Sequence, residues 1–445
     1  MNKRTKELRF LCWGLVAAVL FFLVSNILII NKVLAKGEAY QDLKTFSEVL
    51  SLVQSHYVEE VKPEELVRGA IVGMLRTLDP HSAFMPPEMY KEMQVETEGS
   101  FGGIGIEITM KDDQLTVVSP IEETPAQQAG IKAGDRIMKV NGEPTKGMSL
   151  IDAVHKMRGP SGSKVTITIM REGFTEPKDF AITRAIIKIK SVKWQMKKDN
   201  IGYIRITSFN KTTDSELEKA LKELKEKKLK GFILDLRNNP GGLLDQAVTV
   251  TDFFLEKGEL IVYTKGRTEN QNLRFSSKGR KPHLESPMVI LVNAGSASAS
   301  EIVAGALQDI GRAILVGAKT FGKGSVQTII PLSDGSGLRL TTAKYYTPKG
   351  RSIQEKGIEP DIVIDNLPPG GKESAKARVM REKELKEHME GKIIEGGEGE
   401  EEPATIGHEI PEESKDIQLH KALDILKNWD TFKKSNPIAQ RIKGA

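Results

Sequence analysis

Residues 293–309 constrain the fold of this 445-residue chain more than any other stretch. Small residues form a turn up to Ser298, and an apolar run with helical spacing follows from residue 299 to residue 310. Such a pattern predicts a buried helix that presents Ser298 at its N-terminus. A lone lysine, Lys323, follows between two glycines and is the second notable feature of this region.

Composition and charge limit the class of protein. A length of 445 residues predicts two or three domains. The hydrophobic fraction of 39% and the charged fraction of 28% are typical of globular proteins. The net charge is only +5, and no basic block with interleaved aromatics lies outside the N-terminal arm, which argues against a nucleic-acid partner. Cys12 is the only cysteine, so an intrachain disulfide and a thiolate metal site are excluded.

The N-terminus predicts the compartment. A basic arm over residues 1–9 is followed by an apolar run over residues 10–30. A membrane-spanning helix needs about 20 apolar residues, whereas the apolar part of a signal peptide has roughly 7–15. We therefore expect an anchor whose basic flank stays in the cytoplasm, with the remainder outside it, in a bacterial periplasm or cell envelope. Small residues over 33–35 keep a cleavable signal open, and a cleaved chain would be secreted.

Residues 36–98 have a helical pattern. Apolar stripes on either side of residue 60 predict a helical hairpin that stops at Leu78-Asp79-Pro80. A hairpin of this size cannot bury both of its faces alone, so we expect it to pack on another domain or on a second subunit of a homo-oligomer.

Residues 99–188 change to strands and turns. A glycine turn runs into an alternating strand, a short helix covers residues 125–131, and Asn141-Gly142 predicts a hairpin. A helix follows over residues 150–157, and residues 165–170 predict a closing strand.

This order of elements resembles a PDZ domain. Four residues stand where that family has its carboxylate-binding loop: Gly103, Ile104, Gly105 and Ile106. Glycines allow consecutive backbone N–H groups to point at an anion, and an open strand edge can accept a peptide as an added strand. The alternative is an ordinary glycine turn in a hairpin.

Residues 189–365 alternate between strand and helix patterns, which predicts a sheet flanked by helices. The predicted strands cover residues 201–206, 231–236, 288–292 and 313–316, and the predicted helices cover residues 213–225, 242–254 and 299–310. Residues 366–445 form a third region, predicted to be helical, with an acidic, glycine-rich linker over 396–402 and a short amphipathic helix over 419–429. The expected fold class is therefore multidomain α+β.

The chemistry of Ser298 depends on a base. A serine needs a proton acceptor before it attacks a carbonyl carbon. The sequence lacks the Gly-x-Ser-x-Gly motif and the His-Glu-x-x-His motif, and its seven histidines show no catalytic spacing. Lys323 is the better candidate base, provided that burial lowers a lysine pKa from about 10.4 to roughly 7–8. This pairing predicts a peptidase that needs no metal or other cofactor.

Other interpretations of the two residues remain open. Ser298 and Glu301 also match a capping box, in which the serine only caps the helix. Residues 317–323 imitate the start of a phosphate-binding loop, but Gly324 stands where a magnesium-binding Ser or Thr is required.

A second glycine turn, residues 238–242, follows the buried strand predicted over 231–236. The backbone N–H of Gly241 or Gly242, together with that of Ala299, would suit an oxyanion hole. The alternative is a simple loop leading into the next helix.

Together these motifs resemble the C-terminal processing (tail-specific) protease family, serine endopeptidases with an embedded PDZ domain. The resemblance spans residues 42–365 and includes 78–82, 158–160, 235–242 and the serine and lysine motifs. It implies that Ser298 is the nucleophile, Lys323 the general base, Gln327 the residue that orients the lysine, and Asp309 a supporting acidic position.

The resemblance also implies the partners. The PDZ domain would capture proteins with accessible C-termini, and an adaptor protein could control the site. Two other functions stay open: a catalytically silent scaffold that only binds C-termini, and an acyl-transfer enzyme acting on a non-peptide substrate. The set Ser298, Lys323 and Gln327 argues against the scaffold, which needs none of them, and the PDZ domain argues against the non-peptide substrate.

Overall fold

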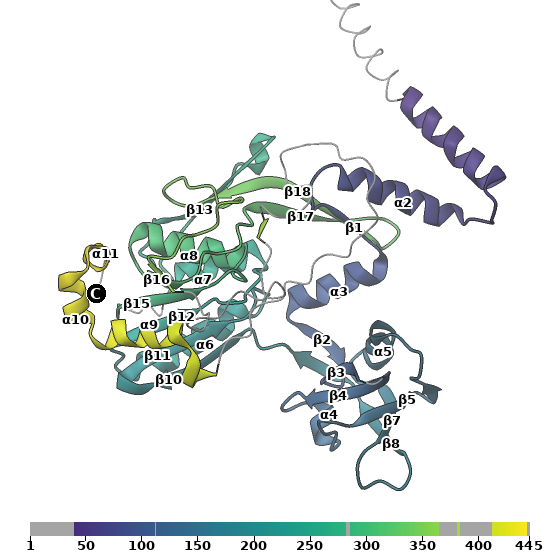
Figure 1. Cartoon of the computed structure of the whole chain (residues 1–445), viewed down its shortest axis with the longest axis horizontal. Helices are drawn as coiled ribbons and strands as arrows, with labels where there is room; N and C mark the ends of the chain where they lie inside the picture. The colour runs from purple at the N-terminus through teal and green to yellow at the C-terminus, as the bar shows by residue number, and fades with distance from the viewer. Residues whose placement is uncertain (1–39, 112, 282–284, 365–380, 383–411, 443–445) are drawn as a thin grey trace, which may run out of the picture. The chain divides into compact units, whose positions relative to one another are not determined.

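The computed structural model describes residues 40–111, 113–281, 285–364, 381–382 and 412–442 (Figure 1). The chain divides into two compact units, Met1–Leu75 and Arg76–Ala445. The predicted anchor over residues 10–30 and the acidic linker over 396–402 lie outside the described residues. Across the described ranges, no helix is both long enough and apolar enough to cross a membrane.

The first unit is helical, as predicted. It contains a helix over residues 40–56 and helix α2 (Pro63–Arg76), which ends at the unit boundary. Proline in the first turn has its φ already set for a helix, and Glu64 and Glu65 place negative charge at the positive end of the helix dipole.

The helical prediction for residues 36–98 is wrong at one point in the second unit. Strand β1 (Ala83–Met85) precedes helix α3 (Pro87–Glu98) and pairs antiparallel with a distant strand, β18 (Gly337–Tyr346). A three-residue strand is too short to show a period-2 pattern, and its partner lies more than 250 positions away in sequence.

The PDZ region is a strand meander with two helices. Its main sheet has the order β3-β4-β5-β7-β8, with β6 on β5, while β2 pairs separately with β9. Asn141 and Gly142 both have positive φ, which confirms the tight hairpin between β5 and β6. The strand predicted to close the domain is β7, but β8 pairs beyond it, so that prediction is wrong. The elements are β2 (Ser100–Gly103), β3 (Ile106–Lys111), β4 (Gln114–Pro120), α4 (Pro125–Gln128), β5 (Arg136–Val140), β6 (Glu143–Pro144), α5 (Leu150–Met157), β7 (Lys164–Met170), β8 (Lys178–Thr183) and β9 (Ala185–Lys188).

A second sheet forms the centre of the following region, as the alternating pattern predicts. Its order is β10-β11-β12-β15-β16-β19; β10 is antiparallel to β11 and the other neighbours are parallel. Every residue of β12 and β15 is buried, as expected for parallel strands covered on both faces. The strands are β10 (Val192–Lys197), β11 (Ile201–Ile206), β12 (Gly231–Asp235), β15 (Met288–Val292), β16 (Ile314–Gly317) and β19 (Ile362–Val363).

Three helices cover one face of this sheet: α6 (Thr213–Lys225), α7 (Leu244–Asp252) and α8 (Ala299–Ile310). Helices α6 and α8 have the predicted bounds, whereas α7 is shorter than the predicted 242–254. The extra positions at its start belong to the glycine turn, where Gly242 has φ +140.

The C-terminal helices cover the opposite face and are part of the core. Leu419, Ile425 and Trp429 pack in one buried cluster with Ile233 and Leu291 of the central strands. Without these helices that face of the sheet would be exposed to solvent. The C-terminal helices are therefore an integral part of the domain that contains the central sheet. The helices are α9 (Ile417–Lys427), α10 (Trp429–Ser435) and α11 (Pro437–Gln440).

A third sheet, which the sequence pattern did not predict, carries the residues that follow Lys323. Its order is β1-β18-β13-β14, with β17 also paired to β18. The antiparallel register places Gln327 of β17 opposite Thr341 of β18. The remaining bounds are β13 (Leu260–Gly266), β14 (Arg274–Ser276), β17 (Ser325–Pro331) and the 3-10 turns Lys198–Asn200, Glu269–Gln271 and Glu413–Lys415.

Candidate active site

Ser298 lies at the N-cap of α8 in a backbone conformation that is unfavourable for a side-chain-bearing residue. Its φ is 52° and its ψ is −110°. A non-glycine residue in such a region costs on the order of 1–3 kcal/mol and persists only when its surroundings hold it. The side chain is half-buried, whereas the flanking Ala297 and Ala299 are buried. Ser298 is thus partly accessible at a strained turn, between two buried neighbours.

The two neighbouring serines in the alternating pattern have structural contacts. Ser296 is fully buried and donates to the carbonyl oxygen of Leu236 at 2.8 Å. Ser300 is also fully buried and donates to the carbonyl oxygen of Asn239 at 2.9 Å. Both hydroxyl groups tie the α8 turn to the loop after β12, which leaves Ser298 as the serine suited to chemistry.

Glu301 joins the two segments that carry Ser298 and Lys323. Its buried carboxylate accepts the backbone N–H of Ser298 at 2.9 Å, which is the carboxylate half of the predicted capping box. It also accepts the backbone N–H groups of Gly322 and Lys323, each at 2.9 Å, and the Thr320 hydroxyl. The capping interpretation and the catalytic one are therefore compatible. The sequence predicted Glu301 only as a capping residue, because no local pattern reveals contacts with residues 320–323.

Burial raises the pKa of Glu301 to about 7, although the Thr320 hydroxyl and three backbone N–H groups favour its ionised form. Burial and hydrogen bonding thus shift the pKa of this carboxyl group in opposite directions, and burial has the larger effect.

Lys323 lies in the loop before β17 and is half-buried. Its neighbour Gly324 donates its backbone N–H to Gln354 Oε1 at 3.0 Å, and a Cβ at Gly324 would lie 2.2 Å from the backbone nitrogen of Gln354. The loop therefore has close contacts on both sides of the lysine, through Glu301 and through Gln354.

Gln327 lies four residues after Lys323, on β17. Its Nε2 donates to Thr341 Oγ1 at 2.8 Å and to Ser325 Oγ at 3.2 Å. Its Oε1 is buried and has no hydrogen-bond partner within the described residues. A buried acceptor without a hydrogen bond carries a desolvation cost of about 1–3 kcal/mol. Such a cost at Gln327 Oε1 suggests that this atom has a function.

The predicted glycine turn lies against Ser298. A Cβ added at Gly241, where φ is +104, would lie 2.9 Å from both Ser298 Cβ and Ala299 N. The Gly241 N–H donates to Asn239 Oδ1 at 2.9 Å. Of the two predicted oxyanion donors in this turn, Gly241 therefore has a backbone N–H that is already bonded to a side chain.

Asp309 lies at the far end of α8 from Ser298. Its Oδ2 accepts the backbone N–H of Lys349 at 2.9 Å, and its Oδ1 pairs with Arg351 at 2.5 Å. These contacts fix the turn after β18, which is a structural role.

The four residues of the predicted PDZ loop line one pocket. Gly103, Ile104, Gly105 and Ile106 meet Val154 and Met157 of α5 there. Arg158 lies at its edge, 4.8 Å above the Phe101 ring and 4.0 Å from Glu92. The pocket between this loop and α5 is mainly apolar, as required for an aliphatic end residue of a peptide.

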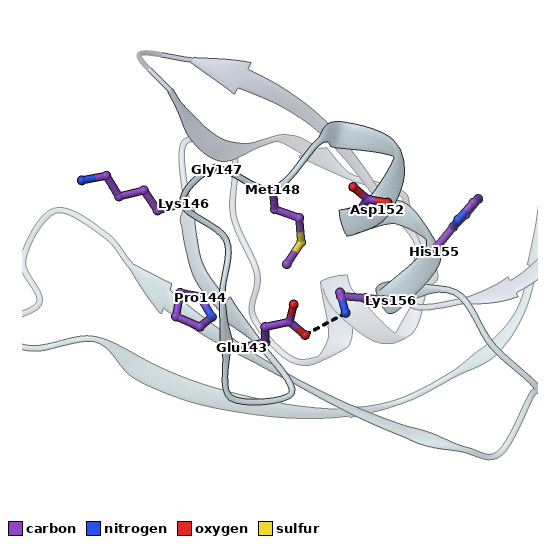
Figure 2. A pocket seen from close by; sticks show the side chains of 8 residues that line it. All are labelled: Glu143, Pro144, Lys146, Gly147, Met148, Asp152, His155 and Lys156. Atoms are coloured by element: carbon purple, nitrogen blue, oxygen red, sulfur yellow. Dashed lines mark hydrogen bonds and ion pairs between the residues drawn. The ribbon is translucent and has the colours of Figure 1, made fainter. Parts of the chain in front are cut away.

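A larger hollow of about 510 Å³ lies elsewhere on the same domain, between the β6 turn and α5 (Figure 2). Several of its polar lining groups already have partners: Lys156 donates to Glu143 at 2.7 Å, Asp152 accepts the Ser149 hydroxyl at 2.6 Å, and His155 contacts Glu92 at 3.1 Å. The lining offers no cluster of groups suited to catalysis.

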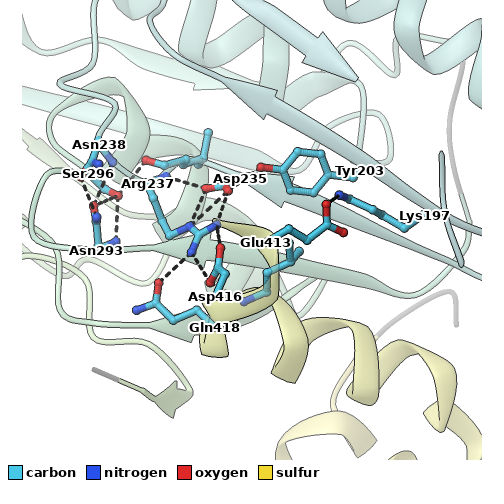
Figure 3. A network of polar contacts seen from close by, with 12 residues as sticks. Lys197, Tyr203, Asp235, Arg237, Asn238, Asn293, Ser296, Glu413, Asp416 and Gln418 are labelled. Atoms are coloured by element: carbon cyan, nitrogen blue, oxygen red, sulfur yellow. Dashed lines mark hydrogen bonds and ion pairs between the residues drawn. The ribbon is translucent and has the colours of Figure 1, made fainter. Parts of the chain in front are cut away.

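A buried polar network joins the end of β12 to the start of α9 (Figure 3). Arg237, 1% exposed, contacts Asp235 at 2.7 Å and Asp416 at 2.8 Å through its guanidinium group. Burial lowers the pKa of Arg237, but the two carboxylates outweigh this effect and raise it above its ordinary value. The sequence pattern did not predict this pairing, because Asp416 lies beyond the acidic linker and belongs to no motif.

Comparisons with known proteins identify the family. The profile of peptidase family S41 matches residues 200–364, the PDZ domain profile matches 92–170, and the profile of the activating protease CtpB N-terminal domain matches 26–89.

Two relatives support this assignment. A carboxy-terminal-processing protease of Bartonella bacilliformis is 46% identical over 96% of this chain and 98% of that protein. The carboxy-terminal processing protease CtpA of Bacillus subtilis is 40% identical over 78% of this chain and 74% of that protein. A solved photosystem II D1 C-terminal processing protease is 32% identical, with a TM-score of 0.43, and covers 72% of this chain and 92% of its own. The chain thus belongs to peptidase family S41, a family of serine-type endopeptidases that includes the carboxy-terminal processing proteases.

Proposed function

We propose that this endopeptidase cleaves proteins that its PDZ domain captures by their C-terminal segment, with Ser298 as nucleophile and Lys323 as general base. The observation that carries the proposal is the shared contact of both residues' backbones with Glu301, which brings together two segments that are distant in sequence.

The proposed reaction has two steps. The neutral amine of Lys323 takes the proton of the Ser298 hydroxyl as Oγ attacks the carbonyl carbon of the substrate. The resulting oxyanion accepts hydrogen bonds from the backbone N–H groups of Ala299 and Gly242. The protonated lysine then gives its proton to the leaving amine. Water hydrolyses the acyl-enzyme with the same lysine as base, which regenerates Ser298.

Substrate capture is assigned to the pocket between Gly103–Ile106 and α5. The backbone N–H groups of a glycine loop suit a terminal carboxylate, and the apolar lining suits an aliphatic last residue. The strand edge beside the pocket would hold the preceding residues of the peptide.

The test uses an unstructured protein that ends in an aliphatic residue, incubated with the chain lacking residues 1–35. Wild type is expected to cleave it, and Ser298→Ala and Lys323→Ala are expected to lose cleavage while still binding the C-terminal peptide. Ser300→Ala, a neighbouring serine with a structural contact, should retain cleavage. Peptide binding without cleavage by wild type would favour the silent scaffold or an enzyme that needs an adaptor.

We further propose that residues 10–30 anchor the chain in a membrane, with the peptidase outside the cytoplasm. The length of the apolar run and its basic flank support this arrangement. Membrane fractionation combined with protease accessibility of intact cells tests it. A homo-oligomer formed through the N-terminal helices is a separate proposal, supported by exposed apolar side chains such as Leu43, Phe46 and Leu52, and light scattering tests it.

A further inference from the structure

The motif over residues 78–82 has no role in the reaction described so far, yet it forms a compact turn around the buried Asp79 and Ser82. Asp79, which is 5% exposed, accepts the backbone N–H groups of His81 and Ser82 at 2.8 and 2.9 Å through Oδ1. Its Oδ2 accepts the Ser82 hydroxyl at 2.7 Å. These local contacts would suffice to hold a turn, but Asp79 has one more contact that is not local.

That contact is with Thr341, in the middle of β18. The Thr341 hydroxyl donates to Asp79 Oδ1 at 3.0 Å, and its backbone N–H donates to Ser82 Oγ at 3.1 Å. An ionised carboxylate can only accept hydrogen bonds, so the single hydroxyl proton of Thr341 is committed to Asp79.

The committed proton determines the orientation of the Gln327 amide. A hydroxyl that has given its proton away can only accept, so the group facing it at 2.8 Å must be the Nε2 donor of Gln327. A flipped amide would place Oε1 against Thr341 Oγ1 with no hydrogen between them. The Oε1 atom is therefore held on the other side, where it is buried with no partner among the described residues.

We infer that Asp79 is a positioning residue for catalysis: through Thr341 it holds the Gln327 amide with Oε1 available to accept a hydrogen bond from the Lys323 amine. This inference rests on the proposed function, because it assigns the unpaired acceptor to the proposed base. It gives the turn at 78–82 a role in the peptidase site, and it explains why a buried acceptor without a partner is kept four residues from that lysine.

The test compares variants of the full chain on a peptide substrate across pH. Thr341→Val keeps the shape of the side chain and suits a strand, but removes the hydroxyl. We expect kcat to fall about 10-fold, with KM within about twofold of wild type, since misplacement of a catalytic group affects the chemical step. An acceptor stabilises an ammonium, so its loss should also move the acid limb of the pH profile of kcat/KM to lower pH. Thr341→Ser restores the hydroxyl and should restore both.

Thr328→Val is the matched control. Thr328 and Thr342 share a hydroxyl–hydroxyl hydrogen bond of 2.8 Å between the same two strands, on an exposed surface away from Gln327. This variant loses a comparable cross-strand contact and should keep the kcat and the pH profile of wild type.

Asp79→Ala provides a second approach, because it removes the acceptor of the Thr341 hydroxyl and so releases the hydroxyl proton. It should lower kcat in the same way as Thr341→Val. The inference is wrong if either folded variant keeps the kcat and pH profile of wild type, or if the loss matches the unfolded fraction seen in thermal unfolding. If cleavage does not depend on Ser298 and Lys323, the proposed function is wrong. If cleavage depends on both residues but not on Thr341, only the inference about Asp79 is wrong.

Discussion

The backbone N–H groups of Ser298 and Lys323 donate to the same atom, Oε2 of Glu301, each at 2.9 Å. Two residues from different segments thus share one buried acceptor. Any change in that acceptor must move the proposed nucleophile and base together.

Glu301→Gln is expected to lower kcat about 100-fold and to destabilise the fold by about 1–3 kcal/mol. The variant replaces one acceptor oxygen by an NH₂ group that faces N–H donors, and a buried donor without an acceptor carries a penalty of that size. Steady-state kinetics and urea unfolding measure the two effects. The control is Glu359→Gln, which removes only an exposed ion pair with Lys319. Wild-type kcat in Glu301→Gln would contradict the role of the shared acceptor.

The stability of the protein should depend on pH through Glu301. Burial raises its pKa from 4.5 to about 7, so between these values the folded state holds a proton that the unfolded state has lost. The stabilising contribution is complete below about pH 4.5 and is lost as pH rises through about 7. The unfolding free energy of wild type relative to Glu301→Gln should therefore fall, by up to roughly 3 kcal/mol, across this window. A difference that is constant or rises with pH would show that the carboxyl group is ionised throughout.

Gly241→Ala is expected to reduce kcat at least about 100-fold. Its Cβ would lie 2.9 Å from Ser298 Cβ and 2.8 Å from the carbonyl oxygen of Ala297, so the serine turn would have to move. Gly258→Ala separates this effect from backbone strain, because Gly258 also has positive φ (+94) but no atom within 4 Å of an added Cβ. That control should cost about 1 kcal/mol in stability and leave kcat unchanged. Equal kcat values for the two variants would refute the close approach.

Asp416→Asn is expected to destabilise the protein by about 2–4 kcal/mol, because it removes one of the two carboxylates that pair with the buried Arg237. Asparagine can still cap α9, so the loss reports on the ion pair and not on the helix terminus. Glu413→Gln breaks a pair with Lys197 whose glutamate end is 58% exposed, and should change stability by less than about 1 kcal/mol. Urea unfolding compares the two; equal small losses would show that Arg237 is satisfied by Asp235 alone.

Much of the architecture could be predicted from local patterns. The helix of residues 299–310 and the buried strand of residues 288–292 were predicted with their observed bounds, because apolar periodicity and small-residue turns are properties of consecutive residues. Residues 103–106 were predicted as a carboxylate-binding loop from the resemblance to a PDZ domain; they line a pocket, and peptide binding there stays a prediction.

The sheet that carries Gln327 could not be predicted in this way. Strand β18 pairs with β1 and β17, and the first of these pairings joins residues 83–85 to residues 337–339. Pairing between distant strands depends on which strand edges come together as the chain folds. The sequence of a three-residue strand does not indicate which strand it pairs with.

The sequence by itself determined which residue types are present and where the local elements begin, including Ser298 at a helix start and Lys323 between glycines. Only the tertiary structure decided how they are held: Glu301 beneath both backbones, Thr341 against Gln327, and Asp416 against Arg237. Hydrogen bonds between buried groups form wherever packing brings donor and acceptor within about 3 Å. That proximity is a property of the whole fold and leaves no periodic pattern in the sequence.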